Sequence, residues 1–131
     1  MPNHVHFICK PLLKISLSKT FNITHMRYSR YINKRKKQIG HLWQGRFFSS
    51  LLIEEHLYEA VRYVENNALK AGLVEKIEDL KWSSATGHLG VFKSSLELID
   101  YKKYLKDIKD WKYYLSENAN QDIIKKIKKI L

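Results

Sequence analysis

Residues 54 to 72 carry the pattern that most restricts how this chain can fold. Apolar residues recur there at steps of three and four, at Leu57, Val61, Val64, Ala68 and Ala71. This is the period of a helix with one buried face. Glu54 and Glu55 favour a helix N-terminus, and Gly72 is a natural C-cap. We therefore expect a helix here, on which Tyr63 and Asn67 are neighbours beside the core face because they lie four residues apart.

Three further helices are expected from similar signals. The first runs from about Leu17 to Lys37. It carries a stripe of basic residues along the helix that continues to its last residue, formed by Arg27, Arg30, Lys34, Lys36 and Lys37. A short helix is expected after the serine cap at Ser83, and the isoleucines from Ile123 to the final Leu131 predict a last amphipathic helix. The stripe could follow the phosphates of a nucleic acid, although a solvated helix face explains each residue singly almost as well.

Two stretches are expected to form strands. Apolar and aromatic residues alternate from His4 to Cys9, and residues 46 to 53 are rich in residue types that favour strands. Alternation would place His4 and His6 on one face of a sheet. Two imidazoles so arranged can begin a site for a divalent cation, but the same spacing also occurs by chance in many sheets.

Composition limits the class of protein. The formal net charge is +11 and the sequence pI is about 9.7, which favours a polyanionic partner, although biased genome composition also yields lysine-rich chains. Cys9 is the single cysteine, so the chain contains no internal disulfide. No apolar run reaches the roughly 20 residues of a membrane span, and no signal peptide is visible. We expect a cytoplasmic protein without a membrane partner.

Four motifs occur in the order in which they occur in a known family. They are Met1–Ile8, His41–Phe47, Arg62–Val74, and Trp82–Ala85 with His88–Gly90. Together they resemble the single-tyrosine HUH transposases, especially the REP-associated tyrosine transposase group. The resemblance covers roughly residues 1 to 90, and several ordered motifs are far more specific than any one of them.

The resemblance implies a fold and an order of domains. The fold is α+β, with a ferredoxin-like antiparallel sheet packed by helices. The sheet is expected to miss the first strand and helix of the family, as in an N-terminally truncated member. Residues 1–92 would form the catalytic domain and residues 93–131 a helical C-terminal extension. A sheet lacking that strand would have an open edge, through which a homodimer could form.

The resemblance also implies a site and a reaction. Tyr63 would be the nucleophile of a DNA transposase that nicks and rejoins single-stranded or hairpin DNA through a 5′-phosphotyrosine. His4, His6 and Asn67 would bind Mg²⁺ or Mn²⁺. Tyr63 could instead be an aromatic residue packed at the edge of the core, and Asn67 a polar residue near a helix end.

Other readings of the same residues stay open. Trp43 and Arg46, in the loop after the first helix, could contact DNA, but Trp43 could equally fill the core. The chain could be a catalytically inactive DNA-binding remnant of such a transposase. It could also be a small basic RNA-binding protein, although the aromatic pattern expected of an RNA-recognition motif is not visible.

Overall fold

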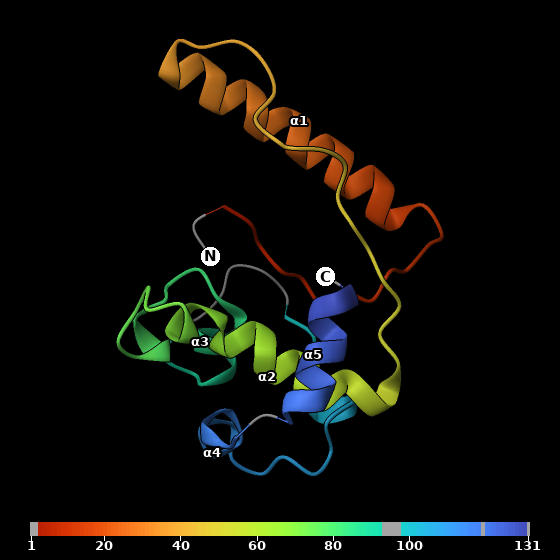
Figure 1. Ribbon diagram of the computed structural model, residues 1–131, viewed down its shortest axis with the longest axis vertical. Helices are drawn as coiled ribbons and strands as arrows, with labels where there is room; N and C mark the ends of the chain where they lie inside the picture. Colours follow the sequence, from red (N-terminus) through yellow and green to blue (C-terminus); the bar gives the residue numbers. More distant parts are fainter. Residues whose placement is uncertain (1–2, 93–97, 119, 131) are drawn as a thin grey trace. The chain divides into compact units, whose positions relative to one another are not determined.

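The computed structural model describes residues 3–92, 98–118 and 120–130 and divides into two compact units (Figure 1). Residues 9–50, here called the α1 unit, contain helix α1. Residues 1–8 and 51–131, here called the α2 unit, contain the other elements. The helices are α1 (Ser16–Lys36), α2 (Glu54–Lys70), α3 (Ser84–His88), α4 (Trp111–Ser116) and α5 (Gln121–Ile130). Two short 3₁₀ helices span Ile77–Asp79 and Tyr101–Lys103.

The four predicted helices are confirmed by α1, α2, α3 and α5. Helix α2 begins with Glu54 and Glu55 in its first turn, as expected from their favourable interaction with a helix N-terminus. After its end, Gly72 adopts φ 65°, and the Leu73 N–H donates to the Ala68 carbonyl at 3.0 Å. Leu131 and the side chain of Ile130 lie outside the described residues, as do Met1 and Pro2.

The predicted ferredoxin-like antiparallel sheet is wrong, because no strand forms within residues 3–92, 98–118 and 120–130. Residues 4–10 and 47–53 are in irregular backbone. Alternating side chains favour a strand, but a strand exists only when a second segment pairs with its N–H and C=O groups. No described segment forms such a ladder with either stretch. The predicted boundary near residue 92 stays a prediction.

In the α1 unit, the segment after α1 turns back along the helix (Figure 1). The Trp43 ring stacks on His25 with centroids 4.1 Å apart, and its indole N–H donates to the His25 carbonyl at 3.2 Å. Nearer the start of the helix, Phe47 stacks on Phe21 at 4.9 Å. These aromatic contacts cover one side of α1, which has no fully buried residue of its own.

Helix α1 ends at Lys36, and its C-cap residue Lys37 adopts the left-handed conformation at φ 50°. The Gln38 N–H donates to the Asn33 carbonyl at 3.0 Å across this turn. A left-handed residue with a Cβ costs roughly 1–2 kcal/mol, part of which a glycine avoids.

We therefore expect Lys37→Gly to stabilise α1 by about 1 kcal/mol. Amide hydrogens in the last turns of α1 should then exchange about five times more slowly. Lys36→Gly removes the same charge inside the helix and should destabilise it by about as much. Equal exchange rates in the two variants would contradict the assignment of Lys37 as the left-handed cap.

The α2 unit has two apolar clusters. In one, Ala60 of α2 packs with Ile124 and Ile127 of α5, and Ile8, Tyr63 and Ile123 lie against them. The other consists of Leu105 with Trp111, Tyr114 and Leu115, and α2 contributes Leu57, Tyr58 and Val61 to its edge. Helix α2 therefore joins both clusters.

The predicted core stripe of α2 is only partly right. Ala68 is buried, whereas Leu57, Val61 and Val64 are partly buried and Ala71 is exposed beyond the end of the helix. The other buried positions of α2 are Ala60 and three polar residues, Arg62, Glu65 and Asn66. The interior contacts of α2 are thus more polar than its apolar pattern predicts.

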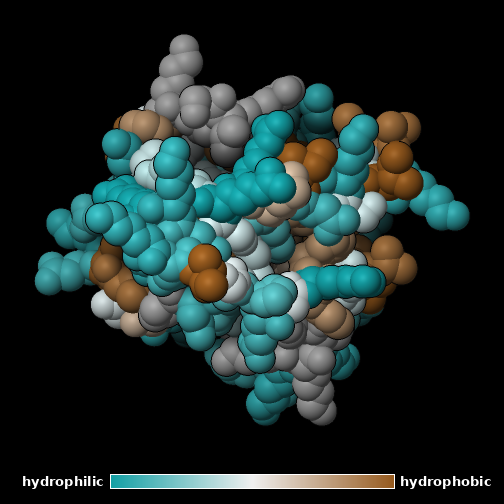
Figure 2. Space-filling model, turned by 90° about the horizontal axis from the view of Figure 1, so that it is seen from above, coloured by the Kyte–Doolittle hydropathy of each residue, from teal (hydrophilic) through white to brown (hydrophobic). Residues whose placement is uncertain are grey.

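Large apolar side chains are also exposed, among them Leu12, Ile39, Leu51 and Trp82. One face of the molecule shows apolar patches between hydrophilic side chains (Figure 2). Across the described ranges, no helix combines the length and apolar character needed to cross a membrane.

The predicted homodimer stays a prediction.

Candidate active site

The structure brings together three of the predicted site residues, His4, His6 and Tyr63. The ring centroids of His4 and His6 lie 4.9 Å apart at an interplanar angle of 75°. The His6 and Tyr63 centroids are 5.8 Å apart at 59°. His6 and Tyr63, which are 57 positions apart in the chain, therefore meet, although the strand predicted to carry His6 does not form.

Packing explains why the histidine segment lies beside α2. Ile8 contacts the cluster of Ala60, Ile124 and Ile127, and the ring of Tyr63 packs against the same cluster. Full burial of a large aliphatic side chain is favourable by roughly 1.5–3 kcal/mol, and the partly buried Ile8 gains a fraction of this. Ile8 therefore anchors the segment two residues after His6, close to the tyrosine.

His6 has the environment of a neutral imidazole. Partial burial lowers its pKa, and the nearby His4 lowers it further because two positive rings repel each other. The His6 Nε2 atom is buried and has no hydrogen-bond partner within the described part of the chain. A buried ring nitrogen without a partner is uncommon, and a neutral imidazole nitrogen can ligate a metal.

His4 is exposed, and its Nδ1 lies 2.8 Å from Asn3 Oδ1. If Nδ1 carries the ring proton, it donates to this oxygen and leaves the Nε2 lone pair available. The two histidines therefore fit a divalent cation as a pair of nitrogen ligands.

Asn67 lies one turn beyond Tyr63 on α2 and is partly buried. Among the described residues, no group of three or more His, Cys, Asp or Glu side chains could hold a metal. An amide oxygen from Asn67 is therefore needed to complete the predicted set. Its role stays a prediction.

Glu65 connects three elements on another side of α2. It is only 3% exposed. The Ser84 hydroxyl donates to its Oε1 at 2.7 Å, and His88 Nδ1 lies 2.7 Å from the same oxygen. The Trp111 indole N–H donates to Oε2 at 2.8 Å. An ionised carboxylate is compensated by such donors, so Glu65 ties α3 and α4 to α2.

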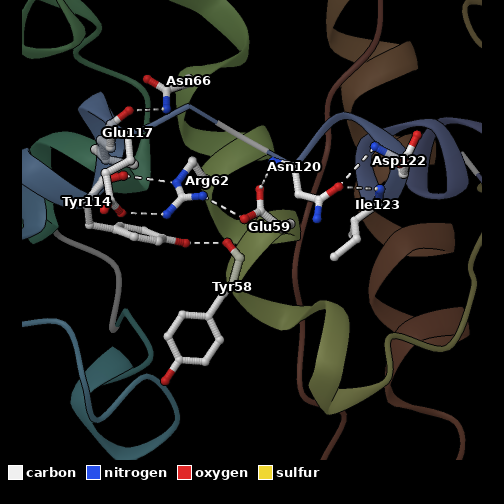
Figure 3. A network of polar contacts seen from close by, with 10 residues as sticks. Tyr58, Glu59, Arg62, Asn66, Tyr114, Glu117, Asn120, Asp122 and Ile123 are labelled. Carbon is white, nitrogen blue, oxygen red and sulfur yellow. Dashed lines mark hydrogen bonds and ion pairs between the residues drawn. The ribbon is translucent and has the colours of Figure 1, made fainter.

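Arg62 makes a second polar connection, to the residues around α4 (Figure 3). Its Nε donates to the Tyr114 carbonyl at 2.9 Å, and its two terminal nitrogens lie 2.6 Å from Glu59 and 2.9 Å from Glu117. The Asn66 amide donates to the Leu115 carbonyl at 2.8 Å, while the Tyr114 hydroxyl donates to the Tyr58 carbonyl. Burial raises the pKa of Tyr114, which keeps this hydroxyl protonated.

The interior positions of Arg62, Glu65 and Asn66 were not predicted from the sequence. They flank Tyr63 in the chain, yet they bond to α3, to α4 and to Glu117 just after α4. Their spacing of three and four residues could have indicated a shared helix face. This face fixes α2 within its unit, whereas Tyr63 contacts His6.

The two units differ strongly in charge. Residues 9–50 contain 10 of the 24 Lys and Arg and none of the 13 Asp and Glu, a net charge of +10 out of +11. The predicted DNA-binding side chains all lie in this unit. Those of Arg27, Arg30, Lys34, Lys36 and Lys37 are exposed. With no carboxylate in the unit, every Lys, Arg, Asp or Glu side chain there that carries a formal charge is positive, which favours a polyanionic partner.

The loop residues Trp43 and Arg46 differ in their surroundings. Trp43 is partly buried and packs against His25 and Tyr28. Packing was one of the two roles that the sequence allowed for Trp43, the other being a contact with DNA. Arg46 is exposed. The DNA contacts predicted for both residues stay predictions.

Comparison with known proteins gives one match. A family model described as "Transposase IS200 like" matches residues 1–67, which is just over half of the chain and includes His4, His6, Tyr63 and Asn67. No curated protein and no solved structure matches the chain.

Proposed function

Because the chain belongs to the family of IS200-like transposases, we propose that it nicks and rejoins single-stranded DNA with Tyr63 as nucleophile. The proposal is carried by one observation: the half-buried imidazole of His6, with an unpartnered Nε2, lies against the ring of Tyr63. A phenol beside an imidazole that can ligate a divalent cation suits metal-assisted attack on a phosphodiester. Hairpin DNA is the proposed substrate.

His4, His6 and Asn67 would hold the cation. When bound, Mg²⁺ or Mn²⁺ would neutralise a non-bridging phosphate oxygen and orient the phosphate for attack. The lowered pKa of His6 keeps its ring neutral near pH 7, so that its nitrogen lone pair is available. Partial burial of the ring keeps some water away from it, which strengthens electrostatic interactions nearby.

Tyr63 performs the covalent step. Its phenol oxygen loses a proton to solvent and attacks phosphorus, forming a phosphotyrosine bond to the 5′ end. The bond from phosphorus to the 3′ oxygen breaks, and that oxygen takes a proton and leaves as a 3′-hydroxyl. A 3′-hydroxyl from another end then attacks the same phosphorus and releases Tyr63. One phosphodiester is exchanged for another, so no external energy source is needed.

Exposed cations of the α1 unit would bind the strand. Arg27, Arg30 and Lys34 lie three and four residues apart, so they share one face of α1. Each phosphate that such a residue neutralises releases counterions, so binding should weaken as salt is added. This contribution is independent of the DNA sequence.

The test is formation of a covalent adduct. Labelled hairpin DNA incubated with the full chain and Mn²⁺, then denatured, should give a protein–DNA band that disappears with EDTA. His6→Ala should weaken the band by more than the roughly 10–100-fold loss caused by removing an outer-shell partner of a metal ligand. His56→Ala, which changes a histidine elsewhere on α2, is the matched control and should leave the band unchanged. Retardation in a native gel without any covalent band would favour an inactive DNA-binding remnant instead.

A further inference from the structure

The α1 unit contains a hollow of about 630 Å³ between the start of α1 and the segment that returns along it. The helix contributes Ser18 and Asn22, and the returning segment contributes Arg46, Phe47 and Ser49. Four of these five residues are exposed and Phe47 is partly buried, so the hollow is open to solvent and a ligand can reach it directly. None of these residues belongs to the His4, His6 and Tyr63 group.

The lining combines one cation, neutral polar groups and an aromatic ring. Neither a salt bridge nor a hydrogen bond of the Arg46 guanidinium occurs within residues 3–92, 98–118 and 120–130. The Ser18 hydroxyl donates to the Ile15 carbonyl at 3.1 Å, so its oxygen can still accept. Asn22 offers both a donor and an acceptor. Phe47, which stacks on Phe21, supplies an apolar wall.

The surrounding charge selects an anion. The α1 unit has no acidic side chain, so no carboxylate of this unit neutralises Arg46. A guanidinium suits phosphate because its planar N–H groups can donate to two phosphate oxygens together. A phosphate alone would not use the amide and the aromatic wall.

We propose that this hollow binds one nucleotide of a single-stranded DNA. Arg46 holds its phosphate, Phe47 borders its base, and Asn22 hydrogen-bonds to the base edge. Ser18 and Ser49 provide further polar contacts. The proposal rests on the proposed function in one respect, that the strand is the substrate of this transposase. It makes the hollow a site for positioning DNA that is built from residues other than the nucleophile.

The test measures binding of a 5′-deoxynucleoside monophosphate to the full chain, followed by NMR signals of the Asn22 side-chain amide and the Phe47 ring. Inorganic phosphate and the deoxynucleoside without phosphate are the two comparison ligands. The nucleotide should bind at least about tenfold more tightly than the deoxynucleoside, since one charge-assisted hydrogen bond from Arg46 to phosphate is typically stabilising by roughly 1.5–3 kcal/mol. It should also bind more tightly than inorganic phosphate, which lacks the hydrogen bond from Asn22 to the base and the contact with Phe47. Equal affinity for inorganic phosphate would overturn the proposal and leave a simple anion site.

Variants separate a specific pocket from general charge attraction. Arg46→Ala should reduce nucleotide affinity about tenfold or more, and Asn22→Ala should reduce it without changing the charge. Lys14→Ala removes one exposed cation of the same unit outside the hollow and should change affinity less than about twofold. A loss in Lys14→Ala as large as in Arg46→Ala would overturn the proposal. Binding needs neither Tyr63 nor a metal, so failure to form a covalent adduct would leave this result intact.

Discussion

The Tyr63→Phe chain is expected to form no covalent protein–DNA species with hairpin DNA and Mn²⁺. The phenylalanine ring keeps the packing that Tyr63 makes against Ala60, Ile124 and Ile127, while the attacking oxygen is lost. The rate of strand cleavage should fall by a factor of at least about 10³, as expected when a covalent nucleophile is removed. Denaturing gels over a time course measure the adduct, and labelled strand ends measure cleavage.

The matched control is Tyr113→Phe, which removes the hydroxyl of a tyrosine in α4 that is 66% exposed. This variant should form the adduct at the rate of the unsubstituted chain. Both variants should retain the same helical circular dichroism, since neither loses a buried hydrogen bond that the structure records. An undiminished adduct in Tyr63→Phe would identify another residue as the nucleophile and would remove the basis of the proposed function.

The helices could be predicted because their signals are local. The acidic first turn and the glycine at its end delimit α2 within two residues of the expected bounds. A serine cap likewise marked α3, where the Ser83 hydroxyl accepts from the Ala85 N–H. Each of these interactions joins residues only a few positions apart. The sequence of one short segment is therefore enough to predict the helix end that it forms.

The strands could not be predicted from alternation alone. The segments 4–9 and 46–53 have side chains suited to a sheet, but pairing depends on a second segment that no local pattern supplies. The contact between His6 and Tyr63 was nevertheless anticipated, through the family resemblance. Its structural cause is the packing of Ile8 against the cluster of Ala60, Ile124 and Ile127, which joins distant residues and is not specified by periodicity.

The burial of the polar side chains of α2 was not predicted, for a related reason. An arginine, a glutamate and an asparagine on a helix suggest a solvated face, and their partners lie far along the chain. The Glu65 carboxylate accepts from Trp111, and Arg62 donates to the Tyr114 carbonyl. Burial becomes favourable only when all these partners are present together. In consequence, α2 carries both the proposed catalytic tyrosine and the buried polar groups that fix the position of the helix in its unit.

Glu65→Ala tests this consequence and should destabilise the chain by about 3–5 kcal/mol, because it leaves buried donors without their acceptor. The Ser84 hydroxyl, His88 Nδ1 and the Trp111 indole N–H all lose their contact in this variant. A loss of this size is a large part of the roughly 5–15 kcal/mol that stabilises a typical domain. Urea unfolding followed by circular dichroism measures the free energy of unfolding.

Two further variants separate the buried contacts of Glu65 from its charge. Glu65→Gln keeps one acceptor oxygen but directs an NH₂ group at one of the donors, so a smaller loss of about 1–3 kcal/mol is expected. Glu75→Ala removes an exposed carboxylate just beyond α2 and should change stability by less than about 0.5 kcal/mol. The expected order of the three losses in the free energy of unfolding reflects burial and not charge, because Glu65→Ala and Glu75→Ala remove the same charge. If Glu65→Ala were no less stable than Glu75→Ala, the connection of α3 and α4 to α2 would not depend on this carboxylate.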